Sequence, residues 1–136
     1  MIFDIETLLL ARLAAKCAPG SVLLGTFDTV DLTDASTTPV VAQIQIAATE
    51  PTAATGKNLR LGVVYSVNVY LDTARADAGE KAAAAALFED ALAALVDYEY
   101  QPGRHVEIVG GKTTEFDGRV LRLAFGLTFP AHVVGT

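Results

Sequence analysis

The chain contains few of the residues that usually build disulfides, metal sites or nucleophilic sites. Among its 136 residues there are one cysteine, two histidines and one methionine, and there is no tryptophan. A single cysteine excludes a disulfide within the chain. Cys17, His105 and His132 lie far apart in sequence and match no metal-ligand spacing. We therefore expect no metal site, and we expect Cys17 to be a buried, inert thiol.

Long apolar runs and an excess of basic charge are also missing. No apolar run approaches the roughly 18 residues needed to span a bilayer. The first twelve residues carry two acids and no base before Arg12, which argues against a secretory signal. With a net charge of −6, broad attraction to nucleic acid or to an anionic membrane is not expected. The length and the 51% hydrophobic content favour a single domain over residues 1–136. Because the N-terminus argues against a secretory signal, synthesis in the cytoplasm is the default expectation.

Two short segments imitate functional sites. Gly111-Lys112-Thr113 resembles the end of a phosphate-binding loop, but the position five residues before Gly111 is Val106 instead of glycine. Asp28, Asp31 and Asp34 could form a carboxylate cluster, although a polar loop favours solvated turn residues. Neither histidine lies in a recognisable nucleophile motif. We therefore predict that the protein is not an enzyme, and a dispersed catalytic site is the minority alternative.

Helical periodicity marks two segments. The first begins at the expected N-cap Asp4 and stops at Pro19 and Gly20. The second follows a capping box formed by Asp77 and Glu80. Each has an apolar stripe of the kind that packs on a core.

Alternation of apolar and other side chains predicts five strands, and turn-forming residues separate them. The strands are expected near residues 21–30, 40–50, 59–71, 104–111 and 118–130, with flexible loops at about 31–38 and 50–58 and a tail at about 131–136. The order α-β-β-β-α-β-β predicts a two-layer α+β domain in which two helices cover a mostly antiparallel sheet. At about 3.3 Å per residue, residues 59–71 would span about 43 Å and project beyond a compact body.

The two longest strands each have one solid apolar face and one mixed face. The apolar faces are expected to lie under the helices, and the mixed faces to point away from them. A mixed face of this kind suits contact with a neighbouring subunit, although a partly solvated sheet face in a monomer is the alternative. The candidate interface residues are Arg60, Val64, Ser66, Asn68 and Tyr70 on the first strand, and Arg122 and Thr128 on the last.

Four stretches, which together extend over nearly the whole chain, carry a family resemblance. These are IETLLLARL (5–13), LRLGVVYSVNVYL (59–71), EKAAAAALFEDALAALVDY (80–98) and GRVLRLAFGLTFPA (118–131). Their order and texture resemble the tail terminator (tail completion) proteins of tailed bacteriophages, including the Mu-like small tail protein group. Ring-forming minor neck proteins look similar.

The resemblance implies a structural virion protein without catalysis or cofactor. Such proteins form a ring, usually of six copies, that caps the tail tube, ends tail polymerisation and provides a docking surface for the head or neck. The implied partners are further copies of the chain, the tail tube protein and a head–tail connector or neck protein, with DNA only passing through the channel. The implied location is the tail or neck of the virion. The alternative is a small α+β ligand-binding or regulatory module without catalysis.

Overall fold

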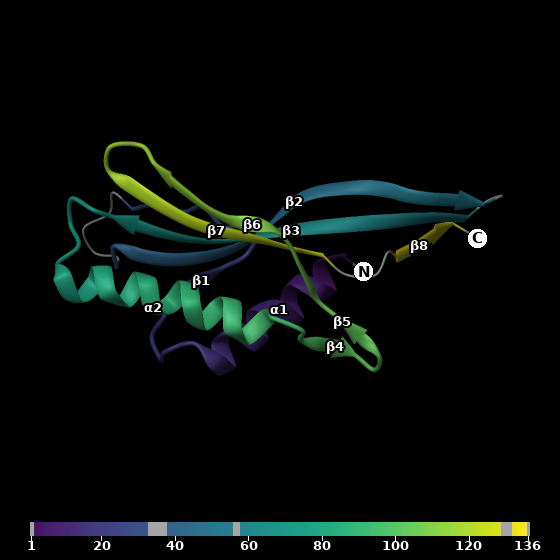
Figure 1. Cartoon of the computed structure of the whole chain (residues 1–136), viewed down its shortest axis with the longest axis horizontal. Helices are drawn as coiled ribbons and strands as arrows, with labels where there is room; N and C mark the ends of the chain where they lie inside the picture. The colour runs from purple at the N-terminus through teal and green to yellow at the C-terminus, as the bar shows by residue number, and fades with distance from the viewer. Residues whose placement is uncertain (1, 33–37, 56–57, 129–131, 136) are drawn as a thin grey trace.

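Two helices pack side by side on one face of a β-sheet (Figure 1). The structure is a computed structural model that describes residues 2–32, 38–55, 58–128 and 132–135. The predicted α+β class, with helices layered on a sheet in the expected order, is confirmed.

The helices are α1 (Ile2–Lys16) and α2 (Ala78–Leu95). Helix α2 starts as predicted, because the Asp77 carboxylate accepts the Glu80 N–H at 2.7 Å and the Glu80 carboxylate accepts the Asp77 N–H at 3.2 Å. Helix α1 begins at Ile2, two residues before the N-cap predicted at Asp4. The apolar stripes of both helices lie in the core, and their buried members include Ile5, Leu9, Leu13, Ala84, Leu87, Phe88, Ala91 and Leu95.

The main sheet has the strand order β1-β2-β3-β7-β6, and β8 pairs with β3 beyond the end of β7. Strands β1 and β2 run parallel, whereas the other neighbours run antiparallel. A separate hairpin is formed by β4 and β5. The bounds are β1 (Leu23–Leu24), β2 (Val40–Thr55), β3 (Asn58–Asp72), β4 (Glu99–Gln101), β5 (Arg104–His105), β6 (Glu107–Phe116), β7 (Val120–Thr128) and β8 (His132–Gly135).

Two segments predicted to be irregular are strands instead. Most of the predicted loop 50–58 belongs to the β2–β3 hairpin, since β2 continues to Thr55 and β3 begins at Asn58. The hairpin tolerates Pro51 because a register shift lies beside it, where a missing backbone N–H does little harm. The predicted tail contains β8, which pairs with the edge of β3 that β7 leaves open.

The remaining strand predictions were partly wrong in their limits. The segment 21–30 contains only the two-residue strand β1, and residues 25–32 form a loop. Residues 104–111 divide between β5 and β6, and β6 continues through Phe116 into the turn at Asp117 and Gly118. Gly118 has a φ of 92°, which supports the predicted turn. The predicted loop 31–38 lies largely outside the described residues.

The β2–β3 hairpin projects beyond the helices, as the length of the strand predicted (Figure 1). Its core-facing part ends near Ile46 and Tyr65, and β7 pairs with β3 only from Val64 onward. We call residues 47–55 and 58–63 the arm. Along the arm, β2 and β3 pair with each other, and β8 borders β3.

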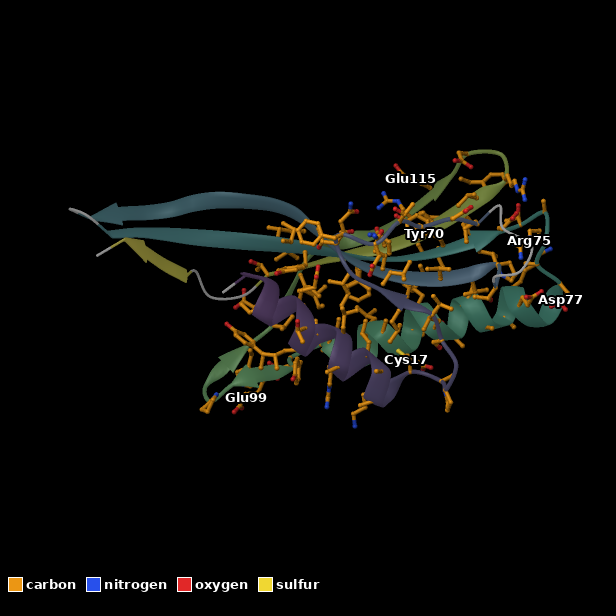
Figure 2. The ribbon with its side chains drawn as sticks, turned by 180° about the vertical axis from the view of Figure 1, so that it is seen from behind. Cys17, Tyr70, Arg75, Asp77, Glu99 and Glu115 are labelled. Atoms are coloured by element: carbon orange, nitrogen blue, oxygen red, sulfur yellow. The ribbon has the colours of Figure 1, made fainter. Side chains whose placement is uncertain are left out.

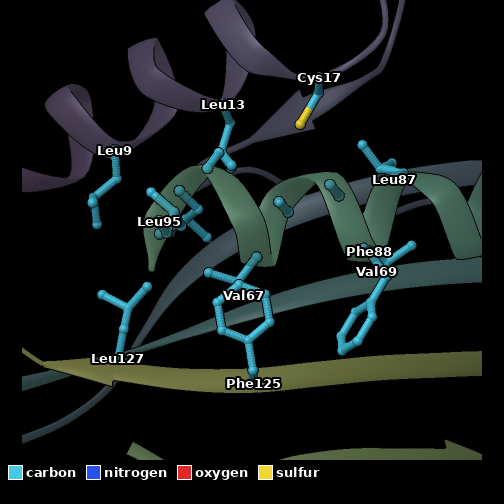
Figure 3. Packing of buried hydrophobic residues seen from close by; sticks show 14 of the residues in the cluster. Leu9, Leu13, Cys17, Val67, Val69, Leu87, Phe88, Leu95, Phe125 and Leu127 are labelled. Carbon is cyan, nitrogen blue, oxygen red and sulfur yellow. The ribbon is translucent and has the colours of Figure 1, made fainter. Parts of the chain in front are cut away.

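The apolar face of the long strands packs under the helices, as predicted, wherever the structure describes their side chains (Figure 3). Tyr65, Val67 and Leu127 are completely buried. The Phe88 ring on α2 meets the Phe125 ring on β7 edge-on, with centroids 5.7 Å apart. These contacts connect both layers into one core.

Cys17 lies in this core with 8% exposure, so the predicted burial of its thiol is confirmed. Burial raises the pKa of the Cys17 thiol, and the nearby Asp90 carboxylate raises it further. We expect a thiol reagent at pH 8 to modify the native protein at least about 100-fold more slowly than the urea-unfolded chain. Equal rates in the two states would contradict this burial.

Candidate functional site

The sheet face away from the helices carries the predicted interface residues. Antiparallel pairing of β3 and β7 sets them in neighbouring rows, so the structure brings six of the seven together. The cross-strand pairs are Val64 with Thr128, Ser66 with Gly126, Asn68 with Ala124, and Tyr70 with Arg122. The backbone of Arg60 lies in the arm, apart from this group, and its side chain is outside the described part of the structure.

Asn68 and Arg122 form an internal network instead of a free contact surface. Asn68 is fully buried, and its Oδ1 accepts hydrogen bonds from Ser66 Oγ at 2.9 Å and Arg122 Nη1 at 2.7 Å. Arg122 also donates from Nε to Glu115 Oε2 at 2.8 Å, and its Nη2 lies 2.7 Å from the same oxygen. Asn68 lies on the predicted face away from the helices, but its side chain is covered within the chain. A charged neighbour covers it and occupies its acceptor.

The loop of residues 25–32 folds back over the same sheet face. Gln43 holds it there, since Nε2 donates to the carbonyl oxygens of Gly25 at 3.1 Å and Asp28 at 3.0 Å. On α1, the Glu6 carboxylate accepts the Thr26 N–H at 2.9 Å and also accepts the Thr26 hydroxyl. The Thr26 oxygen in turn accepts the Ile46 N–H at 3.1 Å. The loop is thus fixed to both layers close to the base of the arm.

Between this loop and the β6–β7 turn lies a groove centred on Tyr70, with Glu115 close by (Figure 2). It consists of two hollows of about 530 Å³ and 380 Å³ that share Tyr70, Asp117 and Val120. We call it the Tyr70 groove, and its charged and aromatic lining comprises Asp28, Asp31, Tyr70, Glu115, Phe116, Asp117 and Arg122.

The Tyr70 groove is acidic. Asp28 Oδ2 accepts the Gly25 N–H at 2.6 Å, and Asp117 Oδ1 accepts the Val120 N–H at 2.9 Å, so backbone donors hold both carboxylates in place. Phe116 is 60% exposed at the rim. Carboxylates around aromatic rings attract cationic groups. The sequence identified Asp28 and Asp31 only as loop residues, because nothing in it indicated that the loop returns to the sheet; Asp34 lies outside the described residues.

A buried carboxylate holds the β6–β7 turn beside the groove. Asp72, the last residue of β3, is completely buried and accepts hydrogen bonds from Arg119 Nε at 2.9 Å and Arg119 Nη2 at 2.7 Å. The hydrogen bonds from Arg119 lower the pKa of Asp72, and the Ala74 N–H and the charge of Arg119 act in the same direction, against the effect of burial. This pair ties β3 to the β6–β7 turn that carries Asp117.

We expect Asp72→Asn to destabilise the protein at pH 7 and to lose this effect at low pH. A carboxyl with a lowered native pKa stabilises the fold above its unfolded pKa, about 3.9, and this contribution disappears as the pH falls through the native pKa. Urea unfolding at pH 7 and near pH 2 measures the difference between variant and wild type. Glu89→Gln on the exposed side of α2 is the control and should change little at either pH. An equal loss in the free energy of unfolding at both pH values would contradict the charge pairing.

The other sequence candidates lie outside this groove. His105 joins β5 to the helix end, with Nδ1 3.1 Å from the Asp97 carbonyl oxygen and Nε2 3.4 Å from Glu99 Oε2. The Asp97 carbonyl and both nearby carboxylates raise the pKa of His105. Lys112 and Thr113 lie in β6, at a register shift, and no helix follows them directly. His132 lies in β8, and its side chain is outside the described part.

Within the described ranges, no group of three or more His, Cys, Asp or Glu side chains is arranged to hold a metal ion. None of the helices described is both long enough and apolar enough to cross a membrane.

Comparison with known proteins shows a similarity of fold to solved structures. No protein-family model and no curated protein matches the chain. One solved structure is similar over 99% of this chain and 95% of the other, with 16% sequence identity and a TM-score of 0.50. At this identity, the similarity shows a shared fold alone.

Proposed function

We propose that the protein is a structural component of a phage-type tail. In this proposal, several copies, usually six in the family that the sequence resembles, form a ring that caps the tail tube and ends its polymerisation. The ring also presents a docking surface to a connector or neck protein, so the protein resides in the tail or neck of a virion. No catalytic step and no cofactor is part of this function.

The arm is the observation that carries this proposal. In the arm, β2 and β3 pair with each other and the four-residue strand β8 borders β3, and a narrow ribbon of this kind is marginally stable alone in water. Among the described residues, the helices pack on the sheet only up to the base of the arm, near Ile46 and Tyr65 (Figure 1). A protein that maintains such a projection gains most from it when a neighbouring molecule packs against it. Assembly by shape fits this architecture better than chemistry in a pocket.

The charge of the chain is compatible with a channel for DNA. A ring of chains that each carry a net charge of −6 would repel the phosphate backbone, so DNA would pass without binding tightly. A lumen lined by basic side chains in the assembled ring would refute this part of the proposal.

Tail-tube assembly in vitro tests the proposed function. Purified tube protein polymerises in the absence and in the presence of this protein, and electron microscopy measures the lengths and ends of the tubes. Capping predicts shorter tubes with an additional ring of density at one end. Unchanged lengths and bare ends would refute the proposal, because a terminator has to bind the growing end.

A further inference from the structure

We infer that His105, when protonated, fixes the β4–β5 hairpin to the end of helix α2, and that the hairpin opens more often when His105 loses its proton. This is a pH-sensitive element within a single chain, and it does not depend on the proposed ring.

The β4–β5 hairpin is short and needs support from outside its own backbone. Its pairing joins Glu99 to His105 and Gln101 to Arg104, with a register shift between the two pairs. A hairpin of this size is at best marginally stable alone in water. Figure 1 shows it projecting beyond the end of α2, away from the main sheet.

The inner side of the hairpin is anchored in the core. Tyr100 and Val106 are buried there, and the Val106 N–H donates to the Tyr98 carbonyl oxygen at 2.8 Å. The guanidinium of Arg12 on α1 lies over the Tyr98 ring, 4.9 Å from its centroid, and Arg12 Nε donates to the Ala94 carbonyl oxygen at 3.1 Å. The outer side, which carries Glu99 and His105, depends on polar contacts instead.

His105 connects this outer side in two directions. Its Nδ1 lies 3.1 Å from the carbonyl oxygen of Asp97 and 3.2 Å from Asp97 Oδ1. Its Nε2 lies 3.4 Å from Glu99 Oε2, on the opposite strand of the hairpin. Asp97 has a φ of 55°, the left-handed conformation that turns the chain at the end of many helices. The imidazole ring therefore ties β5 both to the end of α2 and to β4.

Only the protonated imidazole satisfies both directions. A neutral imidazole has one N–H donor, and its second nitrogen is an acceptor. Both nitrogens of His105 face oxygen atoms of a carbonyl or of carboxylates, which accept hydrogen bonds. In the neutral ring, one nitrogen lone pair would face one of these oxygens, and that contact would be lost.

The charged groups around the ring favour its protonated form. Asp97 follows α2 and Glu99 lies in β4, and Glu107 in β6 carries the same sign of charge. Arg12 reaches the same segment from α1, which packs against β4, but it is engaged in the contacts described above. The Asp97 carbonyl and then the two carboxylates raise the pKa of His105, against the effect of burial.

The hairpin should therefore be fixed most firmly in mildly acidic solution. A histidine whose pKa is raised in the closed form stabilises that form below its unfolded pKa, about 6.5. This contribution is lost as the pH rises through the raised pKa. His105 is 42% exposed, and ion pairs at the surface contribute little, so we expect a small change in hairpin opening and no unfolding of the protein.

Hydrogen exchange of the Val106 amide tests the inference, because this N–H closes the base of the hairpin. Protection lower than that of Val69, in the central strand β3, identifies opening of the hairpin alone. After correction for the pH dependence of chemical exchange, opening should be about threefold more frequent at about pH 8.5 than at about pH 5.5. His105→Gln cannot titrate and should remove this difference.

The titration of His105 gives a second measurement. NMR signals of the imidazole, assigned with His105→Gln, report its pKa in the native protein and in the urea-unfolded chain. The native pKa should be the higher one. Glu99→Gln and Asp97→Asn remove charge at nearly constant shape, and asparagine tolerates the left-handed conformation, so each should lower the native pKa. Glu89→Gln, on the exposed side of α2, is the control and should leave it nearly unchanged.

Four outcomes would overturn the inference. They are a native pKa of His105 at or below that of the unfolded chain, Val106 protection that matches Val69, hairpin opening that is equal at both pH values, and an undiminished pH difference in His105→Gln. None of them affects the tube-capping experiment, so the proposed function is tested separately.

Discussion

Alanine in place of Leu9 should lower the free energy of unfolding by about 2–5 kcal/mol. Leu9 is fully buried, and its side chain lies where α1 meets α2 and the sheet (Figure 3). Removing it takes apolar atoms out of the core and leaves a cavity that the surrounding elements fill only partly. Urea unfolding followed by circular dichroism measures the change.

The neighbouring Leu8 provides a matched control. It is the same residue type on the same helix, but 36% of it is exposed. Leu8→Ala should therefore cost less than about 1 kcal/mol. Equal losses at both positions would mean that the buried face of α1 is not the one described.

Replacing Phe125 with alanine should cost about 3–5 kcal/mol. The ring is 2% exposed and meets the Phe88 ring edge-on, so the variant loses apolar burial and an aromatic contact between β7 and α2. The unfolding midpoint in urea should fall while the slope of the transition stays unchanged.

Phe116 supplies the control for this second substitution. It lies on β6 and is 60% exposed, so Phe116→Ala should change stability by about 0.5 kcal/mol or less. A loss at position 116 as large as that at position 125 would contradict the described packing of the two strands.

The helices and the buried faces could be predicted because each depends on a local pattern. The spacing of Ile5, Leu9 and Leu13 matches a helix that covers a core, and the capping box at Asp77 is read directly from the sequence. Strict alternation through residues 59–71 identified the strand and the face that lies under the helices.

The ends of the hairpin were missed because pairing between distant segments overrides local preference. The segment from Glu50 to Thr55 is rich in small and polar residues and contains Pro51, which locally favours a loop. In the structure it pairs with β3 nevertheless, with a register shift beside the proline. Strand β8 was missed for the same reason. This four-residue segment forms a strand because it pairs with the open edge of β3.

The candidate site was predicted in part. Alternation placed Ser66, Tyr70 and Arg122 on the face away from the helices, and the strand register brings them close together there. It could not show that Arg122 would bind Asn68 and Glu115, because Glu115 belongs to a segment that was expected to be a loop. Nor could it show the groove, which depends on residues 25–32 folding back over the sheet.

The mass of the wild-type protein in solution is the most direct test of the central claim that copies assemble into a ring. Light scattering over a range of concentrations, with and without tail-tube protein, gives this mass. The account predicts growth from the 14.3 kDa chain to a closed species, of six copies if the family resemblance holds, which tube protein stabilises. A monomer at every concentration that also ignores tube protein would contradict it.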